Sequence, residues 1–410
     1  MEFSAITIYW ILIGLTVFGF LFDQWLDYLN DSLKSSTMPP EAEGIYDAER
    51  YAKWLAYDKA KGRLGQFSGA IGILASLAML VFGGFGWVDF WVRDYVSHPI
   101  VVALVFFAVL GLASSVISMP FSVYGTFVIE ERFGFNKTTP KTFVVDMIKG
   151  LLLSLAIGAP LGAFIIWLYL ELGQWFWVSA WGVITVFSVF MTMFAASWIM
   201  PLFNKFTPLE EGELRSAIVQ YCDKVGFKLT NLFVMDGSKR SAKSNAFFSG
   251  LGPRKKIVLY DTLIDQLTTE EIVAVLAHEI GHYKKQHTRQ SMLLSIAQTG
   301  AMLFVLGLFL SYSEFSHALG ASEGSFHVGI IAFGIIFSPI QILLGIGMSV
   351  LSRKNEYEAD AFARDTFDGE PLASALKKLT KENLSNLKPH PWYVFVHYSH
   401  PPLLKRLERL

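Results

Sequence analysis

The chain has 410 residues, of which 53% are hydrophobic and only 17% are charged. This composition is too apolar for a soluble domain of this size and predicts a protein embedded in a lipid bilayer. The net charge of −1 excludes a general attraction to nucleic acid. Cys222 is the only cysteine, which excludes an intrachain disulfide and a cysteine-based zinc site.

Seven stretches are long and apolar enough to cross a bilayer as helices, which takes roughly 20 residues. None of the seven contains Asp, Glu, Lys, Arg or His, so we expect no proton or ion pathway through them. The first stretch has no basic leader or small-residue cleavage site and is expected to remain as a span. The stretches are Ile6–Phe22, Ser68–Trp87, Pro99–Tyr124, Gly150–Leu170, Trp175–Phe203, Ser291–Ser311 and Val328–Val350.

Lysine and arginine alternate between the loops that join these stretches. They are frequent in the loops after the first, third and fifth stretches and in the C-terminal tail, whereas the loops after the fourth and sixth have none. The positive-inside rule therefore predicts that the N-terminus lies outside and that the two long polar segments lie in the cytoplasm.

The chain divides into four predicted parts. Residues 1–203 hold the first five membrane helices, residues 204–290 form a polar segment, residues 291–350 hold two further membrane helices, and residues 351–410 form a C-terminal polar segment. In residues 204–290, Thr268 and Glu271 form a capping box before an amphipathic helix. The other elements predicted there are a helix at Glu210–Val225, strands at Asn231–Met235, Asn245–Phe248 and Lys256–Tyr260, and the capped helix at Ile272–Tyr283.

The capped helix carries His278, Glu279 and His282 in the pattern HExxH. Residues four apart differ by only about 40° around a helix, so the two imidazoles project from one face and can share a zinc ion. Glu279 stands beside them as the candidate general base. We therefore predict one zinc ion per chain and hydrolysis of a peptide bond.

Catalytic zinc has three protein ligands as a rule, so a third must come from elsewhere. Thr288 occupies the position six residues after His282 and excludes the metzincin arrangement. His287 points to a different helix face and is predicted to be a cap or an outer partner of a ligand. Glu356 and Asp360 are four apart, so one can bind the metal while the other holds a ligand imidazole. From composition alone, the segment that contains these two residues fits a solvated acidic turn at the membrane surface as well as it fits a metal site.

His400, in Tyr398-Ser399-His400-Pro401-Pro402, is a further candidate catalytic residue. The tetrahedral oxyanion formed during peptide hydrolysis needs a hydrogen-bond donor near the metal. A histidine in a C-terminal tail is more often structural, so the sequence leaves this assignment open.

Together these residues resemble the membrane-embedded zinc CAAX prenyl protease family, the relatives of the yeast a-factor-converting enzyme. The resemblance covers nearly the whole chain and rests on several short motifs that occur in the same order. Besides HExxH they are Thr126-Phe127-Val128-Ile129-Glu130-Glu131, Phe133-Gly134-Phe135-Asn136-Lys137, Ser244-Asn245-Ala246, Glu356-Tyr357-Glu358-Ala359-Asp360, and Ser399-His400-Pro401 with Arg406.

The resemblance implies a mostly α-helical fold in which seven transmembrane helices form a barrel around a water-filled chamber. A cytoplasmic zinc metalloprotease domain with a small β-sheet would complete it. Glu356 would be the third zinc ligand, His400 would stabilise the oxyanion, and Arg406 would pair with acidic groups near the site, where Asp360 would be a supporting residue. Residues at the start of a strand edge, Asn245, Ala246 and Phe247, would bind the substrate backbone. Phe247 departs from the family, in which tyrosine is frequent at this position.

The resulting function hypothesis is a zinc endopeptidase that cuts near the C-terminus of prenylated CAAX-type proteins or peptides, in contact with the lipid bilayer. Its compartment would be the endoplasmic reticulum in a eukaryote or the inner membrane in a bacterium. One alternative is a membrane-protein quality-control zinc protease. The other is a transporter or scaffold with a vestigial metal site, which the uncharged spans and the intact Glu279 oppose.

Overall fold

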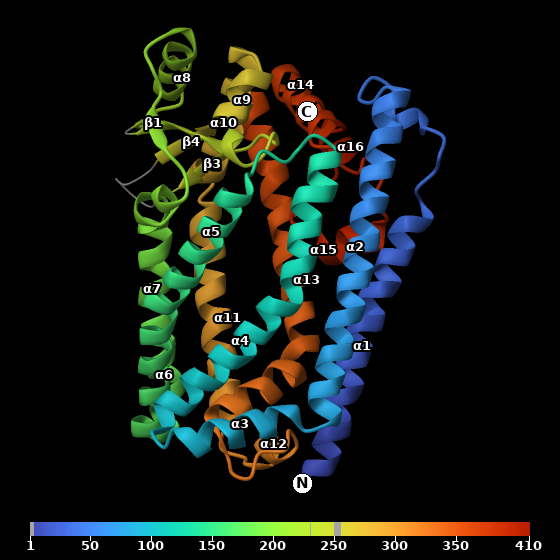
Figure 1. The fold of residues 1–410 in the computed structure, drawn as a ribbon. Coiled ribbons are helices and arrows are strands. Elements are labelled where there is room, and N and C mark those ends of the chain that lie inside the picture. The colour runs from blue at the N-terminus through green and yellow to red at the C-terminus, as the bar shows by residue number, and fades with distance from the viewer. Residues whose placement is uncertain (1–3, 230, 250–255) are drawn as a thin grey trace.

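The structure is a computed structural model that describes residues 4–229, 231–249 and 256–410. Long helices run along the molecule and carry, at one end, a compact part that contains a small sheet and the C-terminus (Figure 1). The N-terminal helix begins at the opposite end. The predicted class, a mostly helical protein with membrane helices and a small sheet, is confirmed.

Six segments of the described chain are long and apolar enough to cross a membrane. One of them, Pro140–Leu202, has 63 residues and covers the two stretches predicted at Gly150–Leu170 and Trp175–Phe203. This segment turns at Gly173, where φ is 49°, so that the helices before and after it pack against each other. The six segments are Ala5–Ser32, Ala48–Val81, Pro99–Glu130, Pro140–Leu202, His287–Phe309 and Phe326–Thr366.

The bundle consists of long helices and two short helices that close the end opposite the sheet, α3 and α12 (Figure 1). A π-helical turn at residues 125–130 follows α4, and a second one at residues 154–158 joins α5 to α6. The helices are α1 (Ala5–Ser32), α2 (Ala48–Val81), α3 (Gly84–Tyr95), α4 (Pro99–Tyr124), α5 (Pro140–Leu153), α6 (Ala159–Leu172), α7 (Phe176–Trp198), α11 (His287–Phe309), α12 (Glu314–His317) and α13 (Phe326–Thr366).

The compact part contains a four-stranded sheet in the order β1-β2-β4-β3. β2 and β4 are parallel, and the two outer strands are antiparallel to their neighbours. Three strands fall where the sequence predicts them, whereas β1, a three-residue strand ending in Pro208, was not predicted. The elements are β1 (Phe206–Pro208), α8 (Glu213–Lys224), β2 (Leu232–Met235), β3 (Ala246–Ser249), β4 (Lys256–Tyr260), α9 (Asp261–Gln266), α10 (Thr269–Lys284), α14 (Gly369–Glu382), α15 (Pro391–His397) and α16 (Leu403–Leu407).

The predicted capping box starts α10. Thr268 Oγ1 accepts from the Glu271 amide at 3.3 Å, and the Glu271 carboxylate accepts from the Thr268 amide at 2.8 Å. The same carboxylate also accepts from Ser374 and Lys378 of α14, each at 2.7 Å. Burial alone would raise the pKa of Glu271, but these contacts hold it below its usual range. The cap therefore fixes both the start of α10 and its contact with α14.

One face of α10 forms the core of the compact part. Ile272, Leu276 and Ile280 recur every four residues and are fully buried against α8, α14 and the sheet. This burial fixes the rotation of α10 about its axis, and thereby the direction in which its two histidines point.

A buried charged cluster lies at the far end of the bundle and was not predicted. His327 Nε2 lies 2.5 Å from Asp89 Oδ1, and Arg93 donates to the same oxygen at 3.0 Å. His327 directly precedes the last predicted span, which begins at Val328. It therefore lies outside the stretches predicted to be free of ionisable residues, and no pattern in the sequence indicated the cluster. The cluster joins α3 to α13 and helps to close this end.

Gly281 allows α10 and α13 to approach closely. A Cβ atom at Gly281 would lie 3.1 Å from Ala359 Cα and 3.2 Å from Phe362 Cβ, closer than ordinary van der Waals contact. Any larger residue would push the two helices apart at the point where His282 and Glu356 face each other.

We expect Gly281→Val to lower the melting temperature of the purified protein by several degrees, because overpacking a well-packed contact costs about 1–3 kcal/mol. Gly334→Val is the matched control, since Gly334 also lies inside a helix but has no atom within 4 Å of an added Cβ. Equal melting temperatures for both variants would show that the close approach is not needed for stability.

Candidate metal centre

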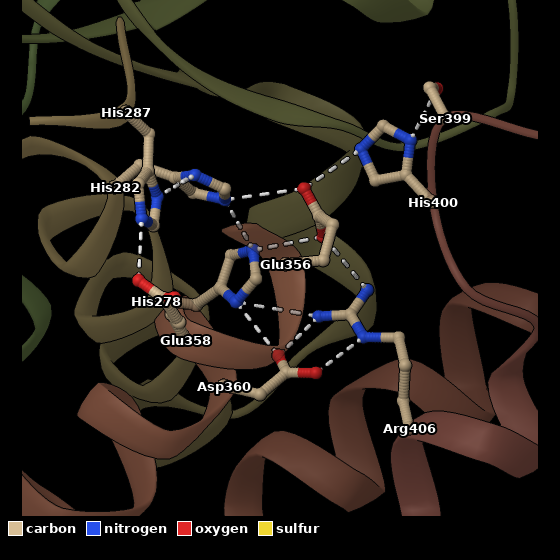
Figure 2. Close-up of polar contacts among 9 residues, drawn as sticks. All are labelled: His278, His282, His287, Glu356, Glu358, Asp360, Ser399, His400 and Arg406. Atoms are coloured by element: carbon tan, nitrogen blue, oxygen red, sulfur yellow. Dashed lines mark hydrogen bonds and ion pairs between the residues drawn. The ribbon is translucent and has the colours of Figure 1, made fainter. Parts of the chain in front are cut away.

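His278, His282 and Glu356 meet where α10 packs on α13 (Figure 2). One ligand atom from each residue lies within 4.8 Å of the others. The two Nε2 atoms are 3.1 Å apart, and the Glu356 oxygens lie 3.4 Å from His278 Nε2 and 3.3 Å from His282 Nε2. The structure thus brings together the three predicted metal ligands.

This geometry fits a tetrahedral zinc site. Nitrogen and oxygen ligands lie about 2.0–2.1 Å from zinc, so tetrahedral angles separate two of them by about 3.3–3.4 Å. The Nε2–Nε2 separation of 3.1 Å lies near this value, as do the nitrogen–oxygen separations of 3.4 and 3.3 Å, which involve two different oxygens of Glu356. Glu356 Oε2 is also buried and makes no hydrogen bond of ordinary geometry among the described residues, although Arg406 Nη1 lies 3.7 Å away, so a metal ion bound there would satisfy it.

Asp360 and Arg406 hold the first imidazole. Asp360 Oδ1 lies 2.8 Å from His278 Nδ1, so Nδ1–H donates to the carboxylate and Nε2 remains free for a metal. Arg406 donates to both oxygens of Asp360, at 2.8 and 2.5 Å. Burial of His278 favours its neutral form, but its contacts with Asp360 and Glu356 outweigh this and raise its pKa to about 9. A proton therefore competes with a metal ion for this imidazole.

A second chain of contacts holds the other imidazole. His287, the first residue of α11, places Nδ1 3.0 Å from His282 Nδ1 and Nε2 3.3 Å from Glu358. If His282 Nε2 faces the metal, its Nδ1–H donates to His287 Nδ1, and His287 Nε2–H donates to Glu358. The sequence indicated an outer partner at His287 but not the link to Glu358, which comes from a distant part of the chain.

Glu279 lines a cavity of about 210 Å³ beside this cluster, together with His282, His287 and Asn355. Burial raises the pKa of the Glu279 carboxyl above its ordinary range. A carboxylate in this environment accepts a proton more readily than one in water, which is the property that a general base requires.

His400 lies on the exposed side of the cluster, with Nε2 3.3 Å from Glu356 Oε1 (Figure 2). Ser399 Oγ is 2.9 Å from His400 Nδ1. A serine hydroxyl that donates to Nδ1 leaves Nε2–H as a donor directed toward the metal cluster. The geometry is compatible with the predicted donor to an oxyanion.

The residues predicted to bind substrate lie at the edge of the sheet. β3 is an outer strand of the described sheet, where it pairs with β4, and it contacts α10. Asn245 accepts from the Tyr260 amide at 3.2 Å, so Ala246 directs its N–H and C=O away from β4. Asn245 Oδ1 accepts from the Ala246 amide at 2.9 Å. Phe247 directs its backbone toward β4, and its ring lies edge-on to Tyr260.

Matches with known proteins cover nearly the whole chain. The family described as "CAAX prenyl protease N-terminal, five membrane helices" matches residues 28–205, and the family described as "Peptidase family M48" matches residues 208–410. The chain belongs to peptidase family M48. The predicted family, the predicted enzyme class of metalloendopeptidase and the predicted membrane character are thereby confirmed.

Several relatives of this M48 chain match it over most of its length. "CAAX prenyl protease 1 homolog" of Oryza sativa subsp. japonica is 38% identical, covering 95% of this chain and 94% of the relative. "CAAX prenyl protease 1" of Saccharomyces cerevisiae is 36% identical, covering 98% and 94%. The crystal structure of S. mikatae Ste24p has a TM-score of 0.93 and 33% identity, and the match covers 98% of each chain. Its fold is the fold of this chain.

We expect His287→Ala to weaken zinc binding by roughly 10- to 100-fold, because residues that orient a ligand imidazole contribute about this much to metal affinity. Each protein is incubated with increasing concentrations of a zinc chelator, and the zinc that remains bound to the protein is measured. His98→Ala is the control, since His98 is exposed and lies at the far end of the bundle. Equal zinc affinity in both variants would contradict the orienting role.

Proposed function

We propose that this chain is a membrane-embedded endopeptidase that holds one zinc ion and cuts near the C-terminus of prenylated CAAX-type proteins or peptides. The observation that carries the proposal is the convergence of His278, His282 and Glu356 next to Glu279. The substrate class is supported by relatives named CAAX prenyl protease 1 that match nearly the whole chain.

A bound zinc ion would polarise the scissile carbonyl and acidify a water molecule. Glu279 would take a proton from that water and later deliver it to the leaving amine. His400 would donate from Nε2 to the oxyanion. Asp360 with Arg406, and His287 with Glu358, would keep the two imidazoles in the required orientation throughout.

The substrate would bind as an added strand on the free edge of β3. Ala246 offers an outward N–H and C=O there, which is the pattern that an extended peptide needs. The Asn245 side chain holds the Ala246 amide in the free protein and would release it to the substrate. The backbone of Phe247 pairs with β4, so this residue would contact the substrate through its ring.

We further propose seven membrane crossings around a chamber, counting the 63-residue segment as two because it turns at Gly173. The chain would then divide into the four predicted parts. The boundary between the first two parts, at residue 203, lies near the junction of the two matched families at residues 205–208. The distribution of lysine and arginine favours an outside N-terminus and a cytoplasmic metal site. That site would face the cytoplasm from the endoplasmic reticulum in a eukaryote or the inner membrane in a bacterium.

Two adjoining cavities support access to the site from within the membrane helices. The cavity beside Glu279 shares Thr288 and Ser291 with a second cavity of about 280 Å³ between α7 and α11. Hydroxyl side chains of both helices line the second cavity, including Ser188 and Ser295. A polar peptide backbone could be solvated there while its lipid chain remains in the bilayer.

We expect Glu279→Gln to bind zinc like the wild type but to lose at least about 100-fold in kcat, because it removes only the proton acceptor. His282→Ala and Glu356→Ala should lose zinc as well as activity, because each removes a ligand. Metal content and peptide cleavage are measured on the same preparations.

Glu270→Gln is the matched control, since Glu270 lies exposed on the same helix. Full zinc content in Glu356→Ala would refute the third ligand. Equal hydrolysis by the wild type and Glu279→Gln would favour a transporter or scaffold with a vestigial site.

We expect the purified protein to cleave a farnesylated CAAX peptide with a kcat/KM at least about tenfold higher than that of its unlipidated twin, since burying a prenyl chain contributes about 0.8 kcal/mol per methylene group. The measurement is release of the C-terminal tripeptide at several substrate concentrations. Equal values for the two peptides would favour a quality-control protease over a CAAX protease.

A further inference from the structure

The chain just before β3 is joined to the connection between α4 and α5. Ser241 forms an antiparallel bridge with Asn136, and the Ala242 amide donates to the Phe135 carbonyl at 3.0 Å. The backbone that leads into the proposed substrate strand is therefore attached on one side to the bundle of long helices.

Lys243, the next residue, is fixed by side chains of two of those helices. Its ammonium donates to the Tyr57 hydroxyl of α2 at 2.7 Å and lies 3.2 Å from the carboxylate of Glu130, at the end of the π-helical turn after α4. The Tyr57 hydroxyl donates to Glu130 at 2.5 Å. The Phe135 ring covers the ammonium at 4.3 Å. A cation held by a carboxylate, a hydroxyl and an aromatic face has little freedom to move.

The backbone of the same residue is fixed by the sheet side. Thr262 Oγ1 donates to the Lys243 carbonyl at 3.2 Å. Asn245 follows two residues later, and Ala246, which directs its N–H and C=O away from β4, comes next. At roughly 3.3 Å per extended residue, Ala246 lies no more than about 10 Å along the chain from the clamped lysine.

We propose that Lys243 is a positioning residue for the substrate: its ammonium, clamped by Tyr57 and Glu130, fixes the free edge of β3 relative to the metal centre. The inference rests on the proposed binding of substrate along β3. A half-buried ion pair contributes little net stability because desolvation offsets its attraction, yet it specifies geometry. Its loss would therefore displace the substrate strand without unfolding the protein.

The test compares Lys243→Met, Lys243→Arg and Lys34→Met in the full-length protein. Lys34 is a matched control, because it is also a partly buried lysine that pairs with a carboxylate of α2, Asp58, while its other ion-pair partner, Asp31, lies on α1 rather than in the sheet. We measure KM and kcat for a farnesylated peptide, zinc content and melting temperature. We also measure the affinity of the peptide for the same variants carrying Glu279→Gln.

We expect Lys243→Met to raise KM and weaken peptide affinity by about tenfold, the effect of losing a charge-assisted contact, with kcat and zinc content within about twofold of the wild type. Lys243→Arg should recover most of the affinity, and Lys34→Met should behave like the wild type. Tyr57→Phe, which removes a single hydroxyl, should weaken affinity by about threefold.

Unchanged peptide affinity in Lys243→Met would overturn the proposal. A loss of peptide affinity in Lys243→Met that is accompanied by loss of zinc or by a lower melting temperature, while Tyr57→Phe keeps its affinity, would also overturn it. Lys243 would then contribute only to the stability of the fold. A wild-type protein that binds the peptide without cutting it would contradict the proposed function, while the affinities would still decide the role of Lys243.

Discussion

The metal centre depends on how closely α10 and α13 pack. The two imidazoles stand on α10, whereas Glu356 stands on α13, so the site exists only where the helices touch. Gly281, inside the HExxH pattern itself, lacks the side chain that would hold them apart, and it lies against backbone atoms of Ala359 on the other helix. Buried apolar residues of α10 then fix its rotation from the opposite face. A tight helix contact thus sets the distance between metal ligands.

Each imidazole is oriented by its own chain of polar contacts. Asp360 and Arg406 hold His278 from α13 and α16, and His287 and Glu358 hold His282 from α11 and α13. These contacts select the tautomer that leaves Nε2 facing the ligand cluster. Because these partners come from several elements, the orientation of the two histidines depends on how the compact part packs and on the positions of two long helices, α11 and α13.

Local patterns in the sequence were sufficient for much of the site. The spacing of His278 and His282 needs only a helix, and the capping box located that helix. The spacing of Glu356 and Asp360 put both carboxylates on one face, but only the resemblance to a family chose between them. The contacts of Lys243 with Tyr57 and Glu130, and of His327 with Asp89, join residues far apart in the chain, and no local period encodes them. β1 was too short for its alternation to be recognised.

α13 is one continuous helix that begins inside the apolar bundle and ends in the compact part, with Pro339 in its first half and Glu356 in its second. Proline removes a backbone hydrogen bond and makes such a position the natural bending point. At 1.5 Å per residue, roughly 25 Å of helix separates Pro339 from Glu356, so a bend of about 3° would displace the carboxylate by about 1.3 Å. A bend of α13 inside the bundle would therefore move one metal ligand relative to the two histidines of α10.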